Sequence, residues 1–378
     1  MDDAPSHTKI ALVLWSGRVG GAETLNIGLA ERLRCLGANV TVVFIETPWP
    51  LAERLSCAGV PYSSLALARG RDILRHPRRY AAEVARAGSN GALLLECGYI
   101  GATLRAAGYR EPIVAVEHGA LLLDLHVLSG PRRLLRRINR VSGAWADDAE
   151  VAVSDFMLGQ VRRHAHARRL QRIYNGIDPD RYVPVGLAVG RGNSLVVGSA
   201  GRLIPGKGTD HLVRAIAKAG ECIPAKLLIA GDGPEQARLR SLAQDLGADS
   251  RVEFVGLIDD VQAFWQRCNV AAIPPDTFVE SFSMVTLEAM ACGQPIVATR
   301  NGAIPELVVN GVTGTVVPPG DASALTRALV SYAEQPERRL AHGTAARARA
   351  IEQFHIEDCA RAYLDLFGEL SEIRRGRR

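Results

Sequence analysis

Two glutamates, Glu280 and Glu288, lie on either side of the predicted start of a helix and suggest a ligand-binding site. The run Phe282–Ala291 is apolar and helix-forming, and Gly293 ends it. Backbone N–H groups in the first turn of a helix have no intrahelical partner and attract phosphate. Carboxylates beside a phosphate site are suited to accept hydrogen bonds from hydroxyls. A nucleotide sugar carries both groups, so we expect that class of ligand. The predicted first-turn donors are Ser281, Phe282, Ser283 and Met284.

A second candidate element is the glycine-punctuated loop Gly201–Gly208, which follows a predicted strand. Its Arg202 and Lys207 can both reach back over small residues. An Arg fork and a Lys ammonium together supply the positive charge that a diphosphate requires where no metal neutralises it. A solvated loop with incidental charge is the alternative. Another glycine loop, which begins at Gly231, follows the next predicted strand.

The first half of the chain places glycines and a histidine where open parallel sheets bind ligands. Gly17, Gly20 and Gly21 follow the first predicted strand, and glycines there let the backbone approach a ligand closely. They do not form the full dinucleotide-binding fingerprint. His118 comes directly after the predicted strand Ile113–Glu117 and could donate to a substrate oxygen or transfer a proton. A tight turn without a ligand and a histidine bound to a backbone carbonyl are the alternatives.

An arginine-rich helix, Arg132–Arg140, has its basic side chains on one face. A solvated surface helix is the simpler interpretation. A patch for anionic lipid, or for an acceptor that carries phosphate, is the other.

Composition narrows the class of protein. The 378 residues include 45 basic and 40 acidic side chains, for a net charge of +5, and 5% are aromatic. No basic run is interleaved with aromatic residues, so we do not expect a nucleic-acid partner. The seven cysteines are scattered without a C-x-x-C pair, and no metal-binding motif occurs, so we expect reduced thiols and no bound metal. The first apolar run, Ile10–Trp15, is too short for a signal peptide or membrane span, and we expect a cytoplasmic protein.

Strand-like runs alternate with helix-like runs along the chain, which indicates α/β domains with parallel sheets. A segment rich in Pro, Gly and charge, residues 179–193, interrupts this pattern and is interpreted as a linker. The predicted strands are 9–15, 40–45, 92–96, 113–117, 150–153, 195–200, 225–230, 252–255, 270–273, 295–298 and 314–317. The predicted helices are 23–36, 51–58, 77–87, 99–107, 132–141, 156–164, 209–219, 236–246, 260–267, 282–291 and 322–334.

Taken together, these residues resemble glycosyltransferase family 4, whose members are retaining enzymes of the GT-B type. The resemblance covers nearly the whole chain in the family's order. Each motif alone is weak, but their ordered occurrence is specific. The matching segments are Gly20–Glu23, Glu117–Gly119, Val151–Ser154, Tyr174–Asp178, Ala200–Leu203 with Lys207–Gly208, Gly231–Pro234, Phe254–Gly256, Glu280–Glu288 and Gly302–Leu307.

The resemblance implies two Rossmann-like domains that face each other across a cleft. We therefore expect an acceptor-binding domain over residues 1–178, a linker over 179–193 and a nucleotide-sugar-binding domain over 194–355. A C-terminal helix, residues 356–378, would pack back on the first domain.

The resemblance also implies residue roles. Arg202 and Lys207 would neutralise the diphosphate, assisted by the backbone N–H groups of residues 282–284. Glu280 would bind the sugar hydroxyls and Glu288 the ribose. His118 would lie near the transferred sugar, with Gly20 and Gly21 near the diphosphate or the acceptor. The implied catalytic residues are His118, Arg202, Lys207 and Glu280. The implied donor-binding residues are Gly201, Arg202, Lys207, Gly231, Gly256, Leu257, Glu280, Ser281, Phe282, Ser283, Met284 and Glu288.

The implied reaction is a front-face transfer with retention, from a UDP- or GDP-sugar to a hydroxyl of a saccharide, lipid-linked or small natural-product acceptor. It would use no metal and no cofactor, because the nucleotide sugar is itself a substrate. Fixed cations would stabilise the charge that develops on the leaving diphosphate. Ser283 departs from the family pattern, in which a glycine is usual, and its side chain would narrow the space beside the sugar.

Three other interpretations are weighed against this one. A GT-B-like sugar-nucleotide epimerase would need no acceptor, and the glutamate pair and the Gly201–Gly208 loop argue against it. The broken fingerprint at Gly17–Gly21 argues against a nicotinamide-dependent dehydrogenase. A non-catalytic binding protein is disfavoured because Arg202, Lys207, Glu280 and Glu288 are all present.

Overall fold

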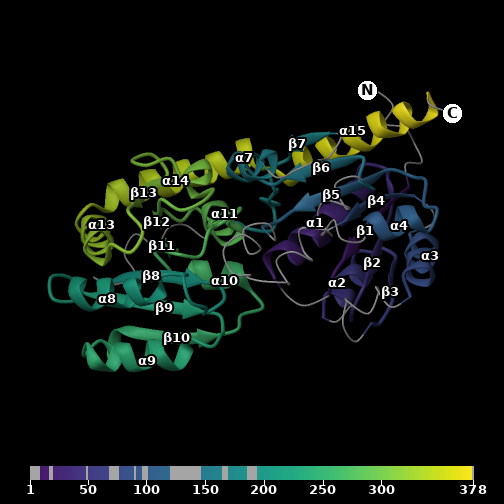
Figure 1. The fold of residues 1–378 in the computed structure, drawn as a ribbon. Helices are drawn as coiled ribbons and strands as arrows, with labels where there is room; N and C mark the ends of the chain where they lie inside the picture. Colours follow the sequence, from purple (N-terminus) through teal and green to yellow (C-terminus); the bar gives the residue numbers. More distant parts are fainter. Residues whose placement is uncertain are drawn as a thin grey trace. The chain divides into compact units, whose positions relative to one another are not determined.

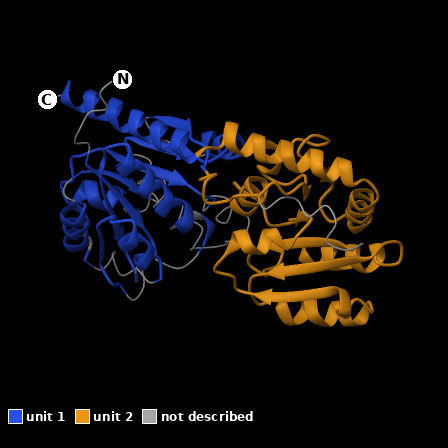
Figure 2. Cartoon of the chain, turned by 180° about the vertical axis from the view of Figure 1, so that it is seen from behind, with its two compact units in different colours: residues 1–176, 356–378 blue, residues 177–355 orange. Residues whose placement is uncertain are grey.

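A computed structural model of the protein describes residues 9–16, 20–47, 50–67, 76–88, 91–95, 101–119, 146–163, 169–184 and 194–376 (Figure 1). The chain divides into two compact units (Figure 2). Unit 1 comprises Met1–Gly176 and Ile356–Arg378, and unit 2 comprises Ile177–His355. The predicted Arg132–Arg140 helix, Gly17 and residues 185–193 of the predicted linker lie outside the described residues.

Unit 1 is built on a parallel sheet with the strand order β3-β2-β1-β4-β5-β6-β7. Its apolar strands are buried because helices follow them along the chain and cover the sheet, as expected for parallel β-strands. The strand order reverses between the parallel neighbours β1 and β4. From β1 to β3 successive strands are added on one side of the sheet, and from β4 to β7 they are added on the other. The described elements of unit 1 are β1 (Lys9–Leu14), α1 (Gly21–Cys35), β2 (Asn39–Phe44), α2 (Leu51–Cys57), β3 (Tyr62–Ser64), α3 (Pro77–Ala87), β4 (Ala92–Leu95), α4 (Gly101–Ala106), β5 (Ile113–Glu117), β6 (Ala149–Ala152), α7 (Asp155–Arg162), β7 (Leu170–Arg172) and α15 (Ile356–Arg375).

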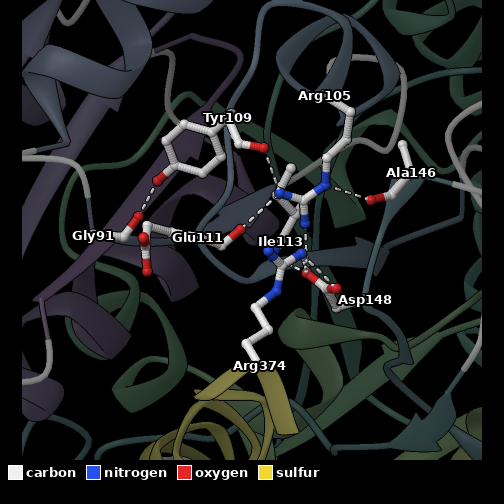
Figure 3. A network of polar contacts seen from close by, with 8 residues as sticks. All are labelled: Gly91, Arg105, Tyr109, Glu111, Ile113, Ala146, Asp148 and Arg374. Carbon is white, nitrogen blue, oxygen red and sulfur yellow. Dashed lines mark hydrogen bonds and ion pairs between the residues drawn. The ribbon is translucent and has the colours of Figure 1, made fainter. Parts of the chain in front are cut away.

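The C-terminal helix α15 belongs to unit 1 and packs against α1. The C-terminal end of α15 is held by the carboxylate of Asp148, just before β6 (Figure 3). We call this carboxylate, with the groups that donate to it, the carboxylate hub. Arg374 of α15 donates from Nη2 to both carboxylate oxygens of Asp148, at 2.7 and 2.8 Å. Arg105 of α4 donates to Asp148 Oδ2 at 2.5 Å, and the Ile113 N–H donates to the same oxygen at 2.9 Å. The Asp148 carboxylate therefore joins α4, β5 and α15 through residues that lie 43, 35 and 226 positions from it in sequence.

Unit 2 has a parallel sheet with the strand order β10-β9-β8-β11-β12-β13, which reverses between β8 and β11. Its described elements are β8 (Leu195–Ala200), α8 (Thr209–Ala219), β9 (Ala225–Ala230), α9 (Gln236–Asp245), η3 (Asp249–Arg251), β10 (Val252–Gly256), α10 (Val261–Gln266), β11 (Val270–Ile273), α11 (Met284–Ala291), β12 (Ile296–Thr299), α12 (Ile304–Leu307), β13 (Gly314–Val317), α13 (Ala322–Glu334) and α14 (Pro336–Gln353).

The predicted α/β class with parallel sheets is confirmed in both units. Each predicted strand and helix within the described residues is present, with ends within two residues of those predicted. Two edge strands of unit 1, β3 and β7, and two helices of unit 2, α12 and α14, were not predicted. Among the described helices, none is both long and apolar enough to cross a membrane.

Candidate functional site

The loops after β8 and β11 meet at the carboxyl edge of the unit 2 sheet, where the strand order reverses. Such a reversal is where open α/β sheets bind ligands. The backbone N–H groups of Asp276 and Phe278 both donate to the Gly206 carbonyl, at 2.9 and 3.1 Å. Gly206 has φ +86°, and an added Cβ would lie 2.6 Å from the Phe278 nitrogen. Glycine is therefore required for the loops to approach this closely.

Lys207 and Glu280 form an ion pair between these two loops. Lys207 Nζ donates to Glu280 Oε1 at 2.6 Å, although the residues are 73 positions apart in sequence. The side chains are 23% and 10% exposed, so the pair is largely shielded from water. The Lys207 ammonium also lies 4.0 Å from the centroid of the Phe278 ring, a distance typical of a cation–π contact. The site thus holds a cation and a carboxylate side by side.

Glu288 lies inside α11, where it is 8% exposed. The Tyr182 hydroxyl donates to its Oε1 at 3.4 Å. Burial raises the pKa of Glu288 to about 7, while the Tyr182 hydrogen bond and the nearby Arg181 charge act in the opposite direction. Near neutral pH this carboxyl can therefore both donate and accept hydrogen bonds. Tyr182 was placed in the predicted linker, and nothing in the sequence connects it to a glutamate 106 positions away.

The start of α11 differs from the prediction. The helix begins at Met284, with Ser283 as its N-cap, so Ser281 and Phe282 precede the first turn. The Ser283 hydroxyl accepts from the Thr286 N–H at 3.4 Å and from the Thr286 hydroxyl at 2.8 Å. Serine is a preferred N-cap because its oxygen satisfies a free N–H group of the first turn. Phe282 instead packs edge-to-face on Phe354, with 5.8 Å between ring centroids.

The predicted glycines of unit 2 lie at the ends of neighbouring strands. The Gly201 N–H donates to the Ala230 carbonyl at 3.0 Å, and the Gly231 N–H donates to the Gly256 carbonyl at 2.7 Å. Gly231 has φ +125°, and an added Cβ would lie 1.9 Å from the Gly201 carbonyl oxygen. Next to these glycines in sequence, Arg202 is exposed and Leu257 is 82% exposed. These loops form an open, backbone-lined edge next to the ion pair.

The remaining predicted site residues, His118, Gly20 and Gly21, belong to unit 1. Burial lowers the pKa of His118 to about 4, so its imidazole is neutral at pH 7. Gly20 is the N-cap of α1 and Gly21 is its first residue. The carboxylate of Glu23 lies close to Gly20. A Cβ added at Gly20 would be only 2.4 Å from Glu23 Oε2. Glu23 therefore places a negative charge in the first turn of α1, where the helix dipole stabilises it.

Within the described residues, no group of three or more His, Cys, Asp or Glu side chains is arranged to hold a metal ion.

Two family models match the chain: "Glycosyltransferase Family 4" over residues 19–181 and "Glycosyl transferases group 1" over residues 190–349. The GDP-mannose-dependent alpha-(1-6)-phosphatidylinositol monomannoside mannosyltransferase of Mycolicibacterium smegmatis is 34% identical over 279 residues, which cover 68% of this chain and 69% of that protein. The chain belongs to glycosyltransferase family 4.

Two further proteins are similar to this family 4 glycosyltransferase, one in sequence and one in structure. The N-acetyl-alpha-D-glucosaminyl L-malate synthase of Bacillus anthracis is 29% identical, over 72% of this chain and 71% of that protein. The crystal structure of Anabaena Alr3699/HepE in complex with UDP and glucose has a TM-score of 0.81 and 25% identity, and it covers 96% of this chain and 100% of its own. These likenesses confirm the predicted family, the pair of Rossmann-like sheets and the enzyme class.

Proposed function

We propose that this enzyme moves a sugar from a nucleoside-diphosphate sugar to a hydroxyl group of a saccharide or lipid-linked acceptor, with retention of the anomeric configuration. The observation that carries the proposal is the Lys207–Glu280 pair, whose charged atoms lie 2.6 Å apart at the strand-order reversal of unit 2. In a nucleotide sugar, the diphosphate and the sugar hydroxyls are also neighbours. A cation and a carboxylate side by side match that order of groups.

The proposed roles follow from the chemistry of each side chain. Lys207, with the exposed Arg202 nearby in the same loop, supplies positive charge to the diphosphate. Glu280 accepts hydrogen bonds from sugar hydroxyls. Glu288 exchanges hydrogen bonds with the ribose, for which its pKa of about 7 suits it, because either protonation state can bind a hydroxyl.

The proposed reaction breaks the bond between the anomeric carbon and the phosphate oxygen and forms a bond from that carbon to the acceptor oxygen on the same face. The departing phosphate oxygen takes the acceptor's proton. Negative charge grows on the diphosphate as the bond opens, so a fixed ammonium at Lys207 stabilises the transition state more than the ground state. No protein nucleophile is required.

The relatives' names support two donor classes. The M. smegmatis relative is named as GDP-mannose-dependent, and the Anabaena structure contains UDP and glucose. We therefore propose a UDP- or GDP-sugar as the donor. The metal-independent mechanism belongs to the same proposal.

Thermal shift with GDP-mannose, UDP-glucose and ADP-glucose tests the donor class. A ligand at 100 times its dissociation constant stabilises the native state by about 2.7 kcal/mol. At about 2–4 °C per kcal/mol for a domain of this size, the melting temperature should rise by roughly 5–10 °C. Release of the nucleoside diphosphate in the presence of mixed acceptors would then report turnover. If no nucleotide sugar shifts the melting temperature, the proposal is wrong. An epimerised donor in the absence of any acceptor would favour an epimerase instead.

A further inference from the structure

The main chain of Glu280 is held on both sides by the loop that follows β12. Its N–H donates to Asn301 Oδ1 at 3.1 Å, and its carbonyl accepts from the Ala303 N–H at 2.8 Å. Gly302 lies between these partners with φ +53°, and an added Cβ would lie 2.0 Å from the Glu280 carbonyl oxygen. The two peptide groups that flank the Glu280 Cα are therefore fixed by three consecutive residues.

Asn301 is the side chain in this arrangement and is 8% exposed. Its Nδ2 donates to the Asp276 carbonyl at 2.8 Å, while its Oδ1 accepts from Glu280. One amide thus spans the loop from Asp276 to Glu280. The Asp276 N–H in turn donates to Gly206, the residue before Lys207. The amide is suited to this place because it combines a donor and an acceptor, which neither an aspartate nor an apolar side chain of that size provides.

We propose that Asn301 is a positioning residue that acts through Glu280 and fixes where the Glu280 carboxylate meets the sugar of the donor. The proposal rests on the proposed function, in which Glu280 binds the sugar and other groups bind the nucleotide. Asn301 itself does not touch the donor in this assignment. Loss of its amide leaves the buried Glu280 N–H without its acceptor and frees the loop to shift. A displacement of about 1 Å at a reacting centre lowers catalysis by up to about 100-fold.

The test compares two ligands on one variant. Binding of the intact nucleotide sugar and of the nucleoside diphosphate alone is measured by titration calorimetry, with the donor found by thermal shift. For Asn301→Ala we expect affinity for the nucleotide sugar to fall about 10- to 100-fold, the loss expected when hydrogen bonds from sugar hydroxyls to a charged carboxylate are broken. Affinity for the nucleoside diphosphate should stay within about twofold. Asn301→Asp keeps the acceptor for the Glu280 N–H, so its loss should be smaller, and it serves if the alanine variant does not fold.

Asn269 provides the matched control. Its Oδ1 accepts from the Val196 N–H at 2.8 Å, just before β11 at the opposite edge of the same sheet. Asn269→Ala removes a comparable bond to the backbone and should lower the melting temperature without changing either affinity. Parallel loss of both affinities in Asn301→Ala, or no loss in either, would overturn the positioning role alone. Absence of nucleotide binding by the wild-type protein would overturn the proposed function together with it.

Discussion

Replacement of Lys207 by methionine separates the electrostatic role of this residue from its packing. Methionine keeps much of the aliphatic stem beside the Phe278 ring but removes the ammonium that lies 2.6 Å from Glu280. The Glu280 side chain is 10% exposed, so its carboxylate would be left with little water to replace the lost partner. A buried charged group without its partner costs about 1–3 kcal/mol or more. Because Lys207 itself is 23% exposed, we expect Lys207→Met to lower the free energy of unfolding by about 2 kcal/mol.

This loss of stability corresponds to a fall of roughly 4–8 °C in melting temperature for a unit of this size. The effect on catalysis should be larger. Removing one fixed group that stabilises developing charge typically lowers kcat by about 100- to 1000-fold. The measurements are a thermal melt and the rate at which nucleoside diphosphate is released from the donor.

The double variant Lys207→Met/Glu280→Gln decides the interpretation. With both charges removed, neither partner is left as an unpaired buried ion, so much of the lost stability should return. Activity should stay at or below the level of the single variant, because both of the groups that we propose bind the donor are gone. Recovery of activity together with stability would show that the pair is structural, and our reasoning about the donor site would be refuted.

Three further perturbations test other parts of the structure. Glu288→Gln removes a carboxyl whose pKa rises from about 4.5 to about 7 on folding, so the wild type should lose stability relative to the variant as pH rises from about 4.5 to 7. The difference should reach up to about 3 kcal/mol by urea denaturation at pH 5 and pH 8, and a constant difference would contradict the shift. Gly208 and Gly247 have similar φ values, +67° and +61°, so Gly208→Ala and Gly247→Ala should cause similar backbone strain. Only at Gly208 would the added Cβ also meet backbone, at 1.8 Å from a carbonyl oxygen. We expect denaturation to show a loss of about 1–2 kcal/mol at Gly247 and clearly more at Gly208, and equal losses would be incompatible with the close approach. Arg374→Met breaks the two hydrogen bonds to the carboxylate hub and should cost about 1–3 kcal/mol, whereas Arg361→Met removes an exposed pair within the same helix and should cost no more than about 0.5 kcal/mol. Equal melting temperatures for these two variants would show that the hub does not hold the helix.

The alternation of apolar runs with helical periods predicted most of the fold, and the elements it missed have physical reasons. β3 is the segment Tyr-Ser-Ser and β7 is Leu-Gln-Arg. Both lie at sheet edges, where one neighbouring strand holds them and no apolar run is needed. Helix α14 is rich in Arg and Ala, and few of its side chains are buried. A sequence search for apolar periodicity therefore passes over it.

For the candidate site, the sequence suggested individual residues, but it did not indicate the contacts that these residues make. Lys207 and Glu280 were both expected to bind the donor, yet their pairing depends on two loops that the sheet topology brings together. Ser283 was interpreted by its position in a motif, whereas its hydroxyl caps a helix that starts two residues later than predicted. No sequence pattern marked Asn301 as a site residue, because its side chain bonds to the backbone of Glu280 and Asp276, which lie 21 and 25 residues away.

The discontinuous composition of unit 1 has a consequence for synthesis on the ribosome. Residues 356–378 are made only after the whole of unit 2, yet they belong to unit 1. Arg374 reaches the carboxylate hub 226 residues after Asp148 has been added to the chain. Domains generally fold as units during translation, N-terminal first. Unit 1 therefore cannot be complete until residues 356–378 have followed the whole of unit 2 out of the ribosome.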